Sequence, residues 1–231
     1  MTTSYAAHIA LFDLDHTLLP IDSDFTWTTF TNAMGWTDAE QSRIANEAFY
    51  QQYKAGRLDM AEYVRFVTRA MRPFTPEQLL AAQEQYGREY IAPHIRQPAL
   101  DLLAQHRAAG HTLVLTTATV CYIARPIGQQ LGFAAEHIIT TQLHYTEQGC
   151  ITGESVGQFN LREGKVHNFE RWLQARGWDW GDVHITFYSD SINDLPLLEK
   201  ANTPVATNPD DQLRQIATER NWHIMDLFQK I

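Results

Sequence analysis

The chain has 231 residues, a formal net charge of −9, 44% hydrophobic residues and 19% charged residues. This acidic balance argues against nucleic acid as a partner, because phosphate backbones are bound by clustered Lys and Arg. No apolar stretch approaches the roughly 20 residues that span a bilayer, residues 1–7 do not resemble a secretory signal, and the two cysteines lack CxxC spacing. We therefore expect a cytoplasmic protein that contacts neither membranes nor nucleic acid.

The first predicted element is a buried strand at residues 8–13 that ends in two carboxylates. Asp13 and Asp15 are two positions apart, so on a strand their side chains point to the same side. Two like charges at the end of a buried strand repel each other and lose solvation. A bound divalent cation would offset that cost. The alternative is an acidic turn in which Asp15 or Thr17 caps the next helix.

Residues 23–90 are predicted to be helical throughout, with breaks at Gly35, at Gly56 and at the prolines of residues 73 and 76. Large apolar side chains recur there at helical spacing, which favours core packing over contact with a cofactor. We expect a separate helical cap over the end of the first strand. The predicted domains are a core of residues 1–20 and 94–231 and a cap of residues 21–93.

After residue 94, helices and strands alternate, apart from one predicted β-hairpin with a turn at Gly149. The predicted strands are residues 112–116, 138–145, 150–152, 183–188, 203–206 and 222–225. Two predicted helices end near residues 110 and 132. Three others cover residues 165–176, 194–199 and 211–220. This alternation predicts an α/β fold with a doubly wound, mostly parallel sheet. Ligands of such sheets bind beyond the carboxyl ends of the strands.

Polar side chains gather at those predicted strand ends. Strand 112–116 is followed by Thr117, although the register leaves Thr116 as the alternative, and strand 183–188 is followed by the acidic residues Asp190 and Asp194. Lys165 opens a helix, where a cation opposes the helix macrodipole and therefore indicates a bound anion. Taken singly, Lys165 reads as a solvated surface lysine and Asp194 as a helix N-cap.

Together these groups suit one chemistry. Carboxylates without a Cys or His cluster favour Mg²⁺, which takes one or two carboxylates and keeps waters and phosphate oxygens. A hydroxyl and an ammonium suit the oxygens of a phosphoryl group in transfer, and Asp can be a covalent nucleophile through an aspartyl-phosphate. The residues therefore predict Mg²⁺-dependent phosphoryl transfer.

In chain order, the acidic run of residues 13–17, Thr117, Lys165 and residues 189–194 resemble the four motifs of the haloacid dehalogenase (HAD) superfamily. The helical block resembles the C1 cap of the phosphoserine-phosphatase-like branch, subfamily IB. The resemblance implies a HAD-like Rossmannoid core and a phosphatase, a hydrolase acting on phosphoric monoesters. An Asp at the second position of DxDxT, here Asp15, is what resembles the phosphatases.

The resemblance also implies a role for each motif residue. Asp13 would be the nucleophile that forms the aspartyl-phosphate, and Asp15 would be the general acid and base. Thr117 would bind a phosphate oxygen, and Lys165 would neutralise phosphate and nucleophile. The implied cofactor is Mg²⁺, with Asp13, the main-chain carbonyl of Asp15 and Asp190 as its direct ligands. Asp194 and Asn193 would support these ligands without binding the ion directly.

Substrate choice is expected to depend on the cap, and the partner is expected to be a small phosphomonoester. The candidate substrate-binding residues are Asp22, Asp24, Arg57 (with Arg65 as the alternative cation) and Thr119. Phosphoserine and histidinol phosphate are both candidate substrates. Two other functions remain open: a phosphotransferase or mutase that uses an alcohol acceptor, and a catalytically silent sensor of phosphate ligands. His16 is either a second proton donor or, as we favour, a turn residue facing outward.

Overall fold

The computed structural model describes residues 5–228, and within them it has a seven-stranded sheet in the order β4-β3-β2-β1-β5-β6-β7. Neighbouring strands are parallel, except that β4 pairs antiparallel with β3. The strands are β1 (Ala7–Phe12), β2 (Thr112–Val120), β3 (Ile138–Tyr145), β4 (Ile151–Val156), β5 (Val183–Ser189), β6 (Thr203–Thr207) and β7 (His223–Met225). The fold class predicted from the sequence, a doubly wound and mostly parallel sheet, is confirmed.

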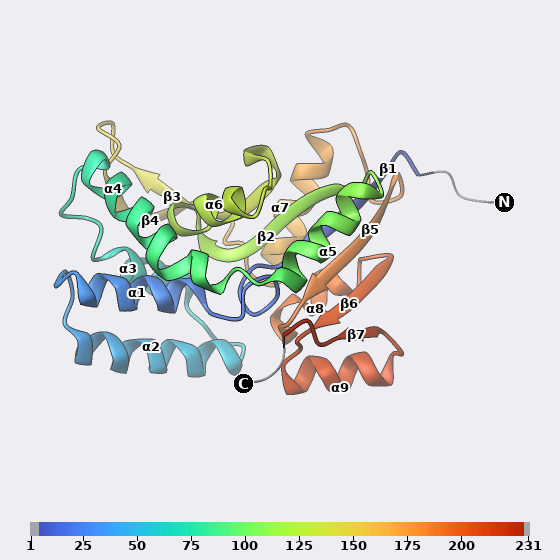
Figure 1. Cartoon of the computed structure of the whole chain (residues 1–231), viewed down its shortest axis with the longest axis horizontal. Helices are drawn as coiled ribbons and strands as arrows, with labels where there is room; N and C mark the ends of the chain where they lie inside the picture. The colour runs from blue at the N-terminus through green and yellow to red at the C-terminus, as the bar shows by residue number, and fades with distance from the viewer. Residues whose placement is uncertain (1–4, 229–231) are drawn as a thin grey trace.

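The helices divide into one group between β1 and β2 and another group that alternates with the strands (Figure 1). The first group is α1 (Ser23–Ala33), α2 (Ala39–Lys54), α3 (Met60–Thr68), α4 (Pro76–Tyr86), a π-helical turn (Gly87–Ile91), a short 3₁₀ turn (Ala92–His94) and α5 (Gln97–Ala108). The second group is α6 (Cys121–Gln130), α7 (Glu163–Gln174), α8 (Leu195–Leu198) and α9 (Asp211–Glu219), with 3₁₀ turns at Ala135–His137 and Ile192–Asp194.

Two hydrophobic clusters, one on each face, bury the central strands. Along β1, Ala10 and Phe12 belong to one cluster, and Ile9 and Leu11 belong to the other. A strand that is covered on both faces needs apolar residues at every position, which explains the unbroken hydrophobic run before Asp13. The same burial fixes where the strand ends and therefore where the acidic pair stands.

Helices α1 to α4 lie together at one end of the sheet (Figure 1). Trp27 of α1 and Val64 of α3 share one hydrophobic cluster with Leu143 and Ile151 of the β3–β4 hairpin. The hairpin therefore packs against the helical block as well as extending the sheet. The division into a core of residues 1–20 and 94–231 and a cap of residues 21–93 stays a prediction.

Several elements differ from the bounds expected from the sequence; β4, for example, runs from Ile151 to Val156 rather than over residues 150–152. Strand β2 runs on to Val120 rather than ending at residue 116, and its pairing with β3 changes register between Thr116 and Val120. Successive β-branched threonines favour extended backbone, so the predicted turn is instead a continued strand. Helix α7 begins at Glu163, which places Lys165 inside its first turn rather than at its start.

Candidate active site

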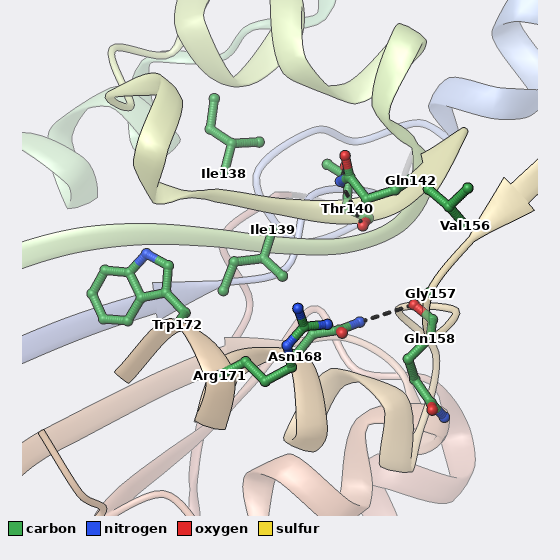
Figure 2. Close-up of a pocket in the computed structure, with 10 residues that line it drawn as sticks. All are labelled: Ile138, Ile139, Thr140, Gln142, Val156, Gly157, Gln158, Asn168, Arg171 and Trp172. Atoms are coloured by element: carbon green, nitrogen blue, oxygen red, sulfur yellow. Dashed lines mark hydrogen bonds between the residues drawn. The ribbon is translucent and has the colours of Figure 1, made fainter. Parts of the chain in front are cut away.

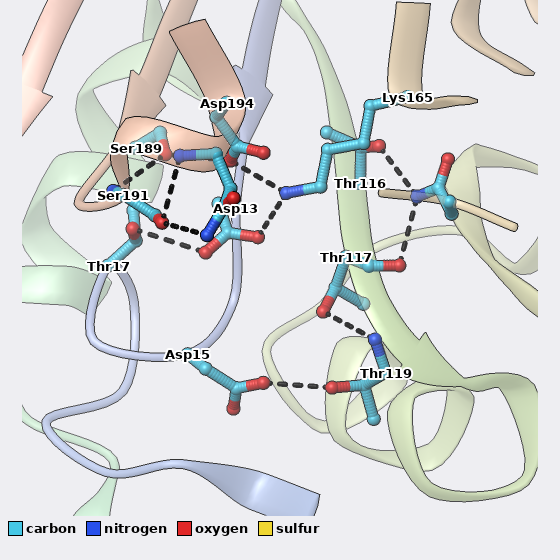
Figure 3. Close-up of polar contacts among 12 residues, drawn as sticks. Asp13, Asp15, Thr17, Thr116, Thr117, Thr119, Lys165, Ser189, Ser191 and Asp194 are labelled. Atoms are coloured by element: carbon cyan, nitrogen blue, oxygen red, sulfur yellow. Dashed lines mark hydrogen bonds and ion pairs between the residues drawn. The ribbon is translucent and has the colours of Figure 1, made fainter. Parts of the chain in front are cut away.

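The carboxyl ends of β1 and β5 bring two carboxylates to one ammonium group (Figure 3). Lys165 Nζ donates to Asp13 Oδ1 and to Asp194 Oδ2, each at 2.7 Å. The Asp13 main-chain N–H donates to the Tyr188 carbonyl at 2.9 Å, which continues the strand pairing up to the site. Asp194 occupies an N-cap position of α8, but its side chain makes no capping bond and accepts from Ser189 Oγ instead. The structure therefore contradicts the two alternatives, because Lys165 is not a solvated surface lysine and the Asp194 side chain does not cap α8.

Burial governs the charges of this group. The Lys165 side chain is 3% exposed. Burial lowers its pKa, but the carboxylates of Asp13 and Asp194 outweigh that effect and hold the pKa above its ordinary value. For Asp13, burial raises the pKa to about 6, with Lys165 acting in the opposite direction and Asp194 adding to the rise. Lys165 therefore keeps a buried carboxylate ionised that would otherwise take up a proton.

A third carboxylate faces Asp13 across the Thr17 hydroxyl. Thr17 Oγ1 lies 3.4 Å from Asp13 Oδ2 and 3.2 Å from Asp190 Oδ1. Burial, followed by the charges of Asp13 and Asp194, raises the pKa of Asp190 well above its ordinary value. Within residues 5–228 no group of three or more His, Cys, Asp or Glu side chains is arranged to enclose a metal ion. Mg²⁺ requires only one or two carboxylates beside waters and substrate oxygens, so the Asp13 and Asp190 pair fits it.

Asp15 lies apart from the lysine and has different partners. Its Oδ1 accepts from the Ser23 main-chain N–H at 2.8 Å, and its Oδ2 accepts from Thr119 Oγ1 at 2.8 Å. Burial of the carboxyl group, followed by the charges of Asp22 and Asp13, raises its pKa to about 8. Because Ser23 begins α1, Asp15 also binds an orphan amide of that helix, so the capping alternative is correct in part. A protonated Asp15 can donate a proton near neutral pH.

The threonines of β2 alternate between the site and the core. Thr116 Oγ1 and the Thr117 carbonyl both accept from Asn160 Nδ2, at 3.0 and 2.9 Å. The Thr117 hydroxyl instead accepts from the Thr119 N–H on the side of Asp15 (Figure 3). Asn160 also donates to the Ile139 carbonyl and is fully buried. These contacts favour Thr117 over Thr116 as the hydroxyl of the second motif.

A tight backbone turn leads into the helix that carries Lys165. A Cβ at Gly164 would lie 1.9 Å from the Phe159 carbonyl oxygen, so only glycine fits there. Arg162 has a φ of 53°, which is an unfavourable backbone conformation for a residue with a side chain. Its Nε donates to Asn193 Oδ1 at 3.0 Å, and its buried Nη2 has no hydrogen-bond partner among residues 5–228.

The candidate substrate residues have distinct surroundings. Asp22 is the N-cap of α1 and accepts from the Phe25 N–H. Asp24 is 5% exposed, and its Oδ1 has no hydrogen-bond partner within the described chain. Arg57 is exposed, and Arg65 is bound to Glu154 of β4 at 2.9 Å. The structure therefore brings Asp22, Asp24 and Thr119 near Asp15, but Asp22 also caps α1 and Arg65 is bound to the hairpin.

The remaining sequence candidates fall outside the carboxylate group. His16 is exposed in a turn with a φ of 56°, and its carbonyl accepts from Asn208 Nδ2, which fits an outward-facing turn residue. Trp27 is buried in the core, as the packing interpretation predicts, whereas Phe25 is 54% exposed. The buried Trp27 Nε1 has no hydrogen-bond partner in the part of the chain that the structure describes.

Sequence reasoning missed three residues at the site. Asn160 joins the second motif to β3, and Arg162 contacts the fourth motif. Tyr53, at the end of α2, donates to Ser191 Oγ at 2.8 Å. Asn160 and Arg162 lie close before Lys165 in a polar segment, but no spacing distinguishes them. Tyr53 resembles any other aromatic of its helix.

A pocket of about 270 Å³ lies elsewhere, between β3 and α7 (Figure 2). It lies at the end of β4, where Gln142 and Val156 are the last pair of the two strands, and its lining also includes Ile139 and Trp172. None of the motif residues lines it. The candidate site is therefore the carboxylate group of Figure 3 and not this pocket.

The family model for haloacid dehalogenase-like hydrolases matches residues 10–199. The chain belongs to this family. The hydrolase class and the HAD family predicted from the sequence are thereby confirmed. Within residues 5–228, each helix is too short or too polar to cross a membrane.

Similar proteins include a histidinol-phosphatase from Neisseria meningitidis serogroup C. It is 35% identical over 222 residues, which cover 95% of this chain and 98% of that protein. A crystal structure from Bordetella pertussis, of a protein of unknown function, has a TM-score of 0.88 and 38% identity over 96% of this chain and 100% of that one. A substrate-bound phosphoserine phosphatase has a TM-score of 0.66 and 15% identity over 96% and 94% of the two chains, and so shares the fold.

Proposed function

We propose that this HAD hydrolase is a Mg²⁺-dependent phosphatase that cleaves a small phosphomonoester through an aspartyl-phosphate on Asp13. The observation that carries the proposal is the pairing of Asp13 Oδ1 with Lys165 at 2.7 Å. This pair holds a buried carboxylate in its nucleophilic form and leaves Oδ2 to face Asp190. A buried ammonium beside a nucleophile also neutralises a phosphoryl group that approaches it.

The residues that would hold Mg²⁺ are Asp13, Asp190 and the main-chain carbonyl of Asp15, with Asp194 and Asn193 supporting them. When bound, the ion supplies positive charge that polarises the phosphoryl group. Asp194 would keep Lys165 in place through their 2.7 Å contact. Lys165 and the Thr117 hydroxyl would bind the phosphate oxygens, and the covered site would exclude bulk water during attack.

Asp15 would serve as acid and then as base. It would protonate the leaving alcohol, and the resulting carboxylate would then take a proton from the water that attacks the aspartyl-phosphate. Its two hydrogen bonds, from Ser23 and Thr119, hold the carboxyl group in one orientation. Without a lysine partner, Asp15 retains its proton at a pH where Asp13 has lost its own.

We propose further that the substrate carries a protonated amine, and we favour histidinol phosphate over phosphoserine. Asp24 is a buried carboxylate with a free acceptor oxygen, and burial, followed by Asp22 and Asp15, raises its pKa. A substrate ammonium would supply the missing countercharge. Phosphoserine also needs a cation for its carboxylate, and Arg65 is engaged by Glu154. Arg57 remains the candidate for that contact. The full-length similarity to a histidinol-phosphatase supports the same choice.

The test is phosphate release by the purified chain from histidinol phosphate, phosphoserine and an aryl phosphate. We expect turnover with Mg²⁺ and none after EDTA. Asp13→Asn should abolish turnover and the acid-stable phosphoryl label on the protein, whereas the exposed control Asp101→Asn should retain both. Activity that persists in Asp13→Asn would refute the nucleophile, and phosphoryl transfer to added alcohols above hydrolysis would favour a phosphotransferase.

A second experiment tests the amine contact. Asp24→Asn should lower kcat/KM for histidinol phosphate by about 10- to 100-fold, because a hydrogen bond to a charged group contributes roughly 1.5–3 kcal/mol. The aryl phosphate has no amine, so its kcat/KM should stay within about two-fold of the wild-type value. An equal loss for both substrates would contradict recognition of an amine by Asp24.

A further inference from the structure

We propose that Asn160 is a positioning residue that sets the spacing between the hydroxyl of Thr117 and the ammonium of Lys165. The inference rests on the function proposed above, in which these two groups bind oxygens of one phosphoryl group. Asn160 lies in the segment between β4 and α7, outside the four motifs, and its side chain is fully buried. Its hydrogen bonds go to two strands and one helix, so it would act through the elements that it joins.

The side chain of Asn160 spans an interruption in the pairing of β2 with β3. The register shifts there, so residues 117–119 of β2 lie opposite Thr140 of β3 alone. Such a bulge breaks the regular ladder of main-chain hydrogen bonds and changes the direction of the side chains on it. Asn160 Nδ2 donates to the Thr117 carbonyl at 2.9 Å and to the Ile139 carbonyl at 3.2 Å, one from each strand. The amide therefore holds the two strands together where their own pairing is interrupted.

The bulge carries two threonine hydroxyls on the side of Asp15 (Figure 3). Thr119 Oγ1 donates to Asp15 at 2.8 Å, and Thr117 Oγ1 accepts from the Thr119 N–H at 3.2 Å. Because Thr117 Oγ1 is the acceptor in that bond, its proton is left for a phosphate oxygen. The carbonyl that Asn160 holds and the hydroxyl that faces the site belong to one residue. The amide therefore controls where the Thr117 hydroxyl lies.

The oxygen of the same amide is bound to the helix that carries Lys165. Asn160 Oδ1 accepts from Asn168 Nδ2 at 3.1 Å. Asn168 stands three positions after Lys165, so the two side chains share one face of α7. Asn168 Nδ2 also donates to the Gln158 carbonyl at 3.1 Å, which ties a second point of the preceding segment to the helix. One amide therefore joins the strand of the second motif to the helix of the third.

The chemistry of the side chain explains why an asparagine stands at this position. An amide has two N–H donors and one carbonyl acceptor, whereas a carboxylate has no donor and leucine has neither. Asn160 is 0% exposed, so water cannot take over the bonds to the strand carbonyls. Without the amide, the bulge of β2 and the first turn of α7 would shift independently. The spacing between Thr117 and Lys165 would then no longer be set.

A double-mutant cycle in kcat/KM for an aryl phosphate separates positioning from stability. In the otherwise wild-type chain, Thr117→Val should lower kcat/KM about 10- to 100-fold, the factor for one hydrogen bond to a charged group. In the Asn160→Leu background the same substitution should cost less than about three-fold, because the hydroxyl is already displaced. Rates are measured at a temperature at which circular dichroism shows each variant to be folded.

Leu213→Ala provides the matched background. It removes a fully buried side chain of α9 and destabilises the fold without touching the amide. Thr117→Val should keep its full effect there. An equal cost of Thr117→Val in all three backgrounds would overturn the inference. Asn168→Ala breaks only the bond to α7, so it serves if Asn160→Leu does not fold. In that background Thr117→Val should cost at least about two-fold less than in wild type, and an unchanged cost would again overturn the inference.

Amide hydrogen exchange at Thr119 tests the geometry without a ligand. The Thr119 N–H donates to Thr117 Oγ1, so it reports whether the bulge keeps its shape. After correction for the unfolding free energy of each variant in urea, exchange should be about ten-fold faster in Asn160→Leu than in Leu213→Ala. Equal corrected rates would contradict the role of Asn160. If the wild-type protein releases phosphate from no phosphomonoester, the proposed function fails, and the exchange rates alone decide whether Asn160 holds the bulge.

Discussion

Replacing Lys165 by methionine tests the charge balance of the site without assuming any activity. Methionine retains most of the aliphatic stem but removes the ammonium that contacts Asp13 and Asp194 at 2.7 Å each. The three side chains are 3%, 9% and 3% exposed, so water cannot replace the lost partner. The variant is left with buried carboxylates that no cation neutralises.

The expected magnitude follows from that burial. Removing one partner of a buried ion pair costs about 3–5 kcal/mol of unfolding free energy. For a chain of this size, 1 kcal/mol corresponds to roughly 2–4 °C in Tm, so Tm should fall by about 6–20 °C at pH 8. The loss should be smaller at pH 5.5. Without Lys165 the pKa of Asp13 rises above its wild-type value of about 6, and the protonated carboxyl then needs no countercharge.

The assay is thermal unfolding by circular dichroism at pH 8 and at pH 5.5, in buffer with EDTA so that no divalent cation replaces the ammonium. Lys200→Met is the control, because Lys200 is an exposed lysine near the Trp180 ring, and its Tm should change by only a few degrees. A Tm of Lys165→Met within 2 °C of wild type at pH 8 would refute the reasoning. So would a larger loss at pH 5.5 than at pH 8.

Three further results are expected. Thr119→Val removes the donor to Asp15 and should lower kcat by about 10- to 100-fold with unchanged circular dichroism, since the carboxylate that Asp15 becomes after it donates its proton would lack a hydrogen bond that contributes roughly 1.5–3 kcal/mol; a kcat within two-fold would contradict this role. Asn160→Leu should lower the unfolding free energy in urea by about 3 kcal/mol, because it leaves several buried carbonyl and hydroxyl acceptors unpaired. Burial, followed by the charge of a neighbouring histidine, lowers the pKa of both His106 and His111. These histidines therefore bind fewer protons in the folded protein than in the unfolded chain. The folded protein loses stability as the pH falls below about 6.5. The wild-type Tm should therefore fall relative to that of His111→Gln between pH 7.5 and pH 5.5, and parallel curves would exclude the histidines as the cause.

The sequence predicted most of the fold because the physical causes of the fold are local. Residues 9–12 of β1 are buried between the two faces of the sheet and are all apolar, and the β3–β4 hairpin turns at a glycine with a φ of 80°. The end of β2 could not be predicted in the same way. Residues 117–119 follow the apolar run of the strand and are predicted from the sequence to form a polar turn, but they remain extended through a change of pairing register with β3. Such pairing depends on a strand that lies some 20 residues further along the chain.

The site divides along the same line between local and tertiary causes. The acidic pair follows from spacing on one strand, but the partners of Asn160 are main-chain carbonyls that only packing brings together. Tyr50 and Tyr53 lie on one helix, and nothing in their spacing shows that Tyr53 contacts Ser191 while Tyr50 is exposed. The sequence does not distinguish Asp22 from Asp24. In the structure, Asp22 caps α1, whereas Asp24 is buried and its Oδ1 has no hydrogen-bond partner among residues 5–228.

The different surroundings of Asp13 and Asp15 would account for the two roles proposed for these identical side chains. Lys165 donates to Asp13. Asp15 instead accepts hydrogen bonds from two neutral donors, the Ser23 N–H and the Thr119 hydroxyl. The pKa of Asp13 is thereby held near 6 while that of Asp15 rises to about 8. Two carboxyl groups whose pKa values are separated in this way can act as base or nucleophile and as acid at the same pH. The assignment of nucleophile and acid therefore depends on the lysine of α7, and exchanging Asp13 for Asp15 would require that lysine to move as well.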